Sequence, residues 1–224
     1  MKKVLRKIAA IVTVASMCML SFTGCSETKS GGSSSSGKES DTINLGFVLP
    51  LTGSVPNLGS AMKNGAELAI EEINNAGGIN GKKIKATIED DENKPATAPN
   101  AITKLIEQDK VDAVLGTYAS SCSIAMAPIA AQNKKVMLSI GSTNAKVTSE
   151  GGEYVFRACF IDPFQGKIAA EYAYNDLDAK KVAVLYDVGK DYCVGISDTF
   201  KETITSLGGE IAYEGKYNTG ESDF

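Results

Sequence analysis

From residue 43 onward, short apolar runs alternate with longer segments in which apolar residues recur at helical spacing. Apolar runs of this length predict buried strands, and strands separated by helices predict right-handed crossovers in a mainly parallel sheet. The chain is therefore expected to have an α/β fold built on a mainly parallel sheet. The expected strands are 43–49, 83–89, 111–115, 136–139, 154–158, 181–186 and 210–217.

Helices are expected between these strands. One should begin at Asp162 as its N-cap with Pro163 at the first helical position, a combination typical of helix starts. Apolar residues of this helix then recur at Phe164, Ile168 and Tyr172. The other helices are expected over 62–73, 98–106, 121–133 and 196–207.

The first 24 residues are predicted to be a secretory signal rather than part of the fold. A basic start is followed by an apolar run over 8–20 and by small residues before Cys25. Residues 20–25 resemble a bacterial lipobox in which Phe22 replaces the usual leucine, which would make Cys25 a lipid attachment site. Residues 25–41 are rich in Gly and Ser and are predicted to be a tether. We therefore expect a lipid-anchored protein on the extracytoplasmic face of a membrane; the alternative is an ordinary signal with an accidental cysteine.

Composition excludes several classes of function. The chain has no His, which removes histidine metal sites and Ser-His-Asp triads, and its formal net charge of -4 argues against nucleic-acid binding. Besides the cysteines of the signal and the lipobox, Cys122, Cys159 and Cys193 remain, without ligand spacing. They are interpreted as buried small residues, or as containing one disulfide pair. No metal site and no cofactor are expected.

Small hydroxyl residues and glycines follow the first, third and fourth strands, over 50–59, 116–121 and 139–144. Parallel sheets bind ligands outside the carboxyl ends of their strands, so these loops are expected to converge on one site. Ser120 and Ser121 stand at a helix start, where hydroxyls and free N–H groups suit a carboxylate. The alternative is that one of them is merely an N-cap. Hydroxyls without a neighbouring base recognise a ligand rather than catalyse a reaction, so no enzyme is expected.

Two other patterns in the sequence point to different functions. Residues 60–63 match S-x-x-K, so Ser60 and Lys63 would be the nucleophile pair of a secreted serine hydrolase. The acidic residues 89–92 could hold calcium, but they lack the ligand spacing of a known loop and are interpreted as a solvated strand end.

Residues 46–53 (GFVLPLTG) and 64–82 (NGAELAIEEINNAGGINGK) resemble the type I periplasmic binding proteins. More narrowly, they resemble the branched-chain amino-acid binding lipoproteins of ABC transporters. The resemblance implies two Rossmann-like lobes that trap an amino acid between them, with lobe 1 over 42–158 and a partial, incomplete α/β lobe 2 over 159–224. It also implies ABC permease subunits as partners and a monomeric binding protein.

The resemblance further implies which residues contact the ligand. Ser120 and Ser121 correspond to the hydroxyl cluster that holds the ligand carboxylate. Ser142 and Thr143 correspond to a backbone carbonyl and a threonine hydroxyl around the ligand ammonium. Three more residues are expected to close or line the pocket: Tyr192, Leu58 and Tyr118.

Members of that family are considerably longer than this chain, and their acidic partner for the ammonium would lie beyond Phe224. The chain is therefore interpreted as a C-terminally truncated member whose incomplete lobe leaves apolar helix faces uncovered. The alternatives within the fold are a sensory receptor for amides, urea or another small molecule, and a truncated fragment without function.

Overall fold

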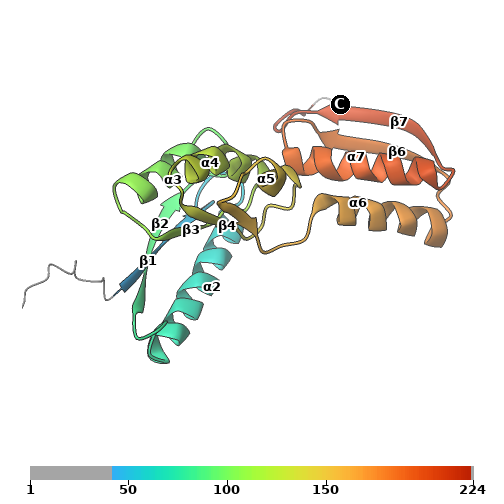
Figure 1. The fold of residues 1–224 in the computed structure, drawn as a ribbon. Helices are drawn as coiled ribbons and strands as arrows, with labels where there is room; N and C mark the ends of the chain where they lie inside the picture. Colours follow the sequence, from blue (N-terminus) through green and yellow to red (C-terminus); the bar gives the residue numbers. More distant parts are fainter. Residues whose placement is uncertain (1–41, 223–224) are drawn as a thin grey trace, which may run out of the picture. The chain divides into compact units, whose positions relative to one another are not determined.

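The computed structural model describes residues 42–222. The predicted signal, the tether and Cys25 lie outside the described residues. The first part is a five-stranded sheet in the order β2-β1-β3-β4-β5, in which every neighbouring pair is parallel (Figure 1). The strands are β1 (Thr42–Leu49), β2 (Lys83–Asp90), β3 (Ala113–Gly116), β4 (Val136–Ser139) and β5 (Val155–Arg157).

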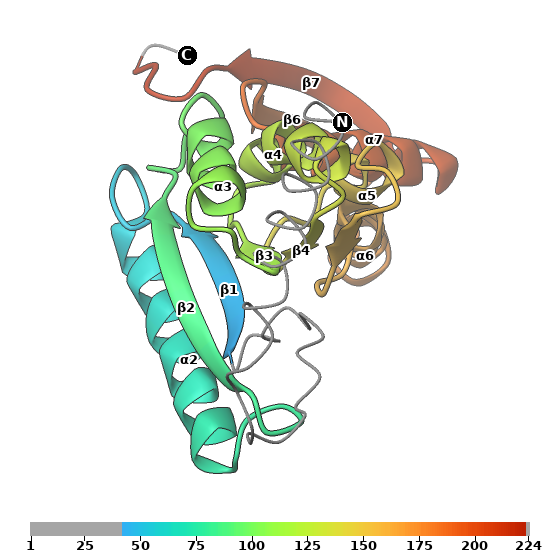
Figure 2. The same cartoon turned by 60° about the vertical axis from the view of Figure 1, so that its left-hand side comes forward.

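Helices cover both faces of this sheet. In this sheet β2 lies on one side of β1 and β3 lies on the other, so the connections from β1 to β2 and from β2 to β3 cross the sheet in opposite directions. Right-handed crossovers therefore place α2 on one face and α3 and α4 on the other. The face under α3 and α4 holds the main core, built from residues such as Val48, Leu105 and Met126. The helices are α2 (Pro56–Asn75), α3 (Ala98–Glu107), α4 (Ser120–Gln132) and the short α5 (Lys146–Ser149), as Figure 2 shows from a second direction.

The second part is a two-stranded parallel sheet of β6 (Lys181–Asp187) and β7 (Glu210–Tyr217). Helix α7 (Asp191–Ser206) packs on these strands, and α6 (Asp162–Glu171) packs against α7 (Figure 1). A π-helical turn, η1 (Tyr172–Asp176), continues α6. The connection between β5 and α6 covers 158–161, and the predicted lobe boundary after residue 158 falls within it.

The structure confirms the predicted parallel α/β fold class and differs from the sequence in local detail. Asp162 is the first helical residue of α6 and Ile161 is its N-cap, so the predicted cap is displaced by one residue. Helix α5 was not predicted, because its four residues are too short to show a period. Among residues 42–222, no helix is both long enough and apolar enough to cross a membrane.

Candidate functional site

A cavity of about 300 Å³ lies where the loops after β3 and β4 face the starts of α6 and α7. Among the residues predicted to contact a ligand, Tyr118, Ser120, Ser121, Thr143 and Tyr192 line it. The loop edge of a parallel sheet thus brings together residues that are far apart in the sequence, as the strand-end argument requires. The complete lining is Asn93, Tyr118, Ala119, Ser120, Ser121, Gly141, Thr143, Phe160, Gln165, Lys190, Tyr192 and Cys193.

Ser120 and Ser121 form the hydrogen-bond donor side of the cavity. They open α4, whose first N–H groups have no partner within the helix and stand at its positive end. The Ser120 hydroxyl oxygen accepts the Asn144 N–H at 3.2 Å, and the Ser121 hydroxyl oxygen accepts the Asp191 N–H at 3.2 Å. Both oxygens therefore act as acceptors for the protein, which leaves both hydroxyl protons to be donated to an anionic group in the cavity.

Two side-chain acceptors in the lining lack donors. Thr143 Oγ1 and Asn93 Oδ1 are buried and accept no hydrogen bond from the described residues, although the Thr143 hydroxyl interacts as a donor with the carboxylate of Asp162. The amide nitrogen of Asn93 is already used, because it donates to the Ser54 hydroxyl at 2.8 Å. A buried acceptor without a donor is costly, so these two oxygens suit a ligand that brings N–H groups of its own.

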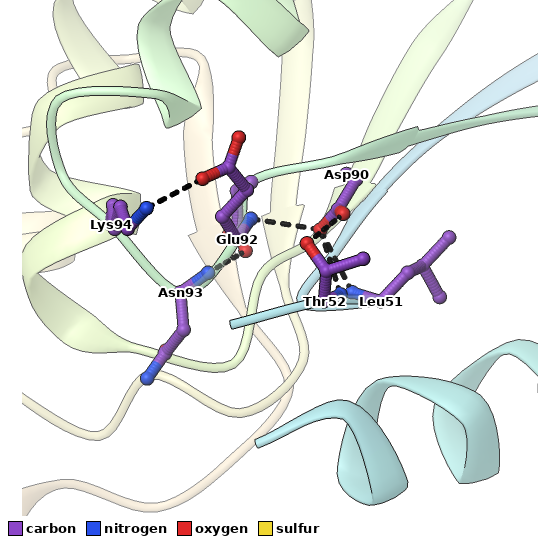
Figure 3. Close-up of polar contacts among 7 residues, drawn as sticks. Leu51, Thr52, Asp90, Glu92, Asn93 and Lys94 are labelled. Carbon is purple, nitrogen blue, oxygen red and sulfur yellow. Dashed lines mark hydrogen bonds and ion pairs between the residues drawn. The ribbon is translucent and has the colours of Figure 1, made fainter. Parts of the chain in front are cut away.

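The acidic end of β2 holds the loop that carries Asn93 (Figure 3). The Asp90 carboxylate accepts hydrogen bonds from Leu51 N at 2.9 Å, Thr52 Oγ1 at 2.5 Å and Glu92 N at 2.8 Å. Partial burial opposes ionisation of Asp90, but these hydrogen bonds prevail and lower its pKa. Asp90 thus ties the start of the β1–α2 loop to the end of β2.

Asp91 is fully buried. It accepts hydrogen bonds from the Thr117 hydroxyl and from Asn93 N, the latter at 2.9 Å. Burial raises the pKa of Asp91, and burial likewise raises the pKa of the neighbouring Cys122 thiol to about 12. The prediction of a solvated strand end is therefore wrong for Asp91, because the β3–α4 loop folds over it. Both carboxylates are occupied by protein donors, and no group of acidic and Cys side chains within 42–222 is arranged to hold a metal ion.

Ser142 and Leu58, which were also predicted to contact a ligand, do not line this cavity. The Ser142 hydroxyl is buried, where it lies 2.8 Å from Ser123 Oγ and donates to backbone carbonyls of the β3–α4 loop. The Ser142 carbonyl accepts from Arg157 and from the Cys159 thiol, each at 3.4 Å. Leu58 stands in the first turn of α2 with 43% of its surface exposed.

The remaining sequence patterns have structural explanations. Ser60 is exposed on α2, and the Lys63 ammonium lies 3.7 Å from a carboxylate oxygen of Glu67 on the same helix. Cys122, Cys159 and Cys193 are all free thiols. Cys122 is buried as predicted, whereas Cys159 and Cys193 are only partly buried.

Sequence reasoning missed several lining residues, namely Asn93, Phe160, Gln165 and Lys190. Asn93 follows β2 at the same sheet edge as the other loops, so the strand-end rule could have found it. The other three surround the starts of α6 and α7. Their position depends on how the two sheets pack, which no local pattern reports.

Comparison with known proteins agrees with this geometry. A family model described as "Periplasmic binding protein" matches residues 42–224. An "Amino acid binding protein" of Pseudomonas aeruginosa is 40% identical over 182 residues, which are 80% of this chain and 48% of that protein. This chain therefore spans about half the length of the curated relatives it matches.

Solved structures give the same fold. The branched-chain amino acid transporter substrate binding protein LivJ of Streptococcus pneumoniae, in complex with isoleucine, is 37% identical with a TM-score of 0.75. That comparison covers 82% of this chain and 51% of LivJ. A solute binding protein of an ABC transporter from Rhodopseudomonas palustris, in complex with 3,4-dihydroxybenzoic acid, is 28% identical with a TM-score of 0.74, over 82% of this chain and 49% of that one.

Proposed function

Because the chain belongs to the periplasmic binding protein family, we propose that it is a solute-binding protein that holds a branched-chain or similar amino acid in the cavity. It would deliver this ligand to the permease of an ABC importer and catalyse no reaction itself. The lipobox-like residues 20–25 and the Gly/Ser-rich 25–41 support attachment through Cys25 to the extracytoplasmic face of a membrane.

The observation that carries the proposal is the matched polarity of the cavity. Ser120 and Ser121 offer hydroxyl protons and the positive end of α4, which suits a carboxylate. Thr143 Oγ1 and Asn93 Oδ1 offer acceptors without donors, which suits an ammonium group. An α-amino acid carries both groups on one carbon, so a single small ligand satisfies both sides.

A thermal-shift titration tests this proposal. Leucine, isoleucine and valine should each raise the melting temperature, because a ligand at one hundred times its Kd stabilises the folded state by about 2.7 kcal/mol. Ser120→Ala should weaken binding roughly tenfold or more, since a hydrogen bond to a charged group is lost. Ser206→Ala is the matched control, because the Ser206 hydroxyl is exposed and donates only to the Thr203 carbonyl. If the chain is folded and none of the three amino acids shifts its melting temperature, the proposed class of ligand is wrong.

A second candidate ligand is an organic carboxylate without an ammonium group. Lys190 is the one charged residue in the cavity lining within 42–222, and Asp187, the acid that interacts with it, lies outside that lining. The Rhodopseudomonas relative, whose ligand is an aromatic acid, fits such a site. Under this candidate, 3,4-dihydroxybenzoate but not leucine raises the melting temperature, and Lys190→Met abolishes that shift. A shift with leucine and none with 3,4-dihydroxybenzoate favours the amino acid.

A further inference from the structure

The start of α7 is attached to the five-stranded part of the molecule through the backbone of one residue, Asp191. The Asn144 side-chain N–H donates to the Asp191 carbonyl at 2.7 Å, while the Asp191 N–H donates to the Ser121 hydroxyl at 3.2 Å. We call this arrangement of Asn144, Ser121 and Asp191 the Asp191 clasp. The residue that follows Asp191 is Tyr192, which lines the cavity.

Asn144 is held in place before it reaches Asp191. Its side chain is 6% exposed, and its Oδ1 accepts the Lys146 N–H at 2.9 Å, which fixes which side of the amide faces α7. Both polar groups of the Asn144 backbone are also hydrogen-bonded. Its N–H donates to the Ser120 hydroxyl oxygen at 3.2 Å, and its carbonyl accepts from the Arg157 guanidinium at 2.6 Å. The donor aimed at Asp191 is therefore pre-organised rather than free to rotate.

The surface of α7 is shaped for this approach. A Cβ atom at Gly195 would lie 2.7 Å from the Asn144 side-chain nitrogen and 2.7 Å from Asp162 Oδ2. Such distances are far below van der Waals contact, so only glycine at this position lets α7 come close enough for the clasp to form.

We propose that Asn144 is a positioning residue that, through the Asp191 clasp, sets Tyr192 at the cavity. Asn144 does not line the cavity itself, so its effect on a ligand passes through Asp191 and Tyr192. Ser121 belongs to both systems, since its oxygen accepts from Asp191 while its proton is available to a ligand. Hydrogen bonds in such a chain strengthen one another, so a ligand carboxylate on Ser121 stabilises the clasp.

Amide hydrogen exchange tests the clasp in the chain without any ligand. Asn144→Asp keeps the acceptor for Lys146 and replaces the donor with an oxygen facing the Asp191 carbonyl. Exchange in a peptide covering 188–195 should rise roughly tenfold, while peptides from β1 and α3 stay unchanged. Asn133→Asp is the matched control, because the Asn133 amide donates to Ile129 near the end of α4 and should leave 188–195 unaffected.

A second variant approaches the clasp from α7. Gly195→Ala should produce the same local rise in exchange, since the added methyl group displaces Asn144. Unchanged exchange over 188–195 in both variants overturns the proposal. An equal rise in exchange in every peptide also overturns the proposal, because such a result would mean that these residues stabilise the whole fold rather than the start of α7.

A double-mutant cycle tests the link to the ligand, and this part rests on the proposed function. With leucine as the probe, Asn144→Asp should raise the dissociation rate roughly tenfold in the parent chain and change it less than twofold when Tyr192 is already alanine. Equal effects in both backgrounds contradict positioning through Tyr192. If leucine does not bind, the proposed function fails while the exchange result still decides the clasp.

Discussion

Asp90 and Asp91 are adjacent carboxylates at the end of β2, yet their pKa values are shifted in opposite directions. Asp90 is partly buried, but hydrogen bonds from Thr52, Glu92 and Leu51 lower its pKa. Asp91 is fully buried, and its pKa is raised because burial outweighs its bonds to Thr117 and Asn93. Asp91 therefore lowers the stability of the folded state when it is ionised.

The opposite shifts predict opposite dependences on pH. Between 3.8, the ordinary pKa, and the raised pKa of Asp91, the folded state binds more protons, so the free energy of unfolding falls as pH rises. Asp91→Asn should remove this fall. For Asp90 the folded pKa lies below 3.8, so its contribution is present above that value and is lost as pH falls. Asp90→Asn should remove that loss. Urea unfolding across a pH series measures both, and matching profiles for the two variants would contradict the assignment.

Among the elements, α6 and α7 pack closely against each other. Gly166 of α6 faces α7 directly, and a Cβ atom there would lie 2.7 Å from the Ile196 carbonyl oxygen and 2.8 Å from Thr199 Cβ. Helices pack this closely only where small residues meet, and Ala170, one turn further along α6, is also fully buried.

Gly166→Ala should destabilise the chain by about 1–3 kcal/mol, because the added methyl group overpacks the contact between α6 and α7. Gly65→Ala in α2 is the matched control. A Cβ atom at Gly65 meets nothing within 4 Å, so alanine there should stabilise by about 0.5–1 kcal/mol through helix propensity alone. Chemical denaturation gives both values. A neutral or stabilising Gly166→Ala would mean that α6 does not pack on α7 as described.

At the scale of the whole molecule, α6 presents an apolar stripe to solvent. Phe164 and Ile168 of α6 and Tyr172 at the start of η1 recur at helical spacing and are 61%, 47% and 56% exposed, because α6 buries its opposite face against α7. An exposed apolar surface of this kind binds hydrophobic molecules.

The stripe predicts that a hydrophobic fluorescent dye such as anilinonaphthalene sulfonate binds the native chain. The double variant Phe164→Lys with Ile168→Lys should reduce the bound-dye fluorescence by about half or more, since most of the stripe becomes charged. Leu68→Lys on α2 changes an isolated leucine of similar exposure and should leave the signal unchanged. Equal signals in all three proteins would locate the dye elsewhere.

The fold class and much of the candidate site were predictable from the sequence, because both follow from the spacing of apolar residues and the order of the strands. Alternating runs predict crossovers, and crossovers place Ser120, Ser121 and Thr143 at one edge. The direction of a side chain was not predictable: Ser142 stands beside Thr143, yet its hydroxyl faces Ser123 in the interior. Burial of Asp91 also depends on a loop distant in sequence, which periodicity does not report.

The position of β1 between β2 and β3 has a consequence for how the chain acquires its structure during synthesis. Thr42 pairs with Lys83 on one side, while Leu45 pairs with Ala113 on the other. Strand β1 is therefore synthesised well before β2 and β3, with which it pairs. The entropy cost of closing the intervening loops must be overcome before either pairing forms. Until β3 has left the ribosome, the nascent β1 has an open edge, and a chaperone that binds extended segments would find its target there.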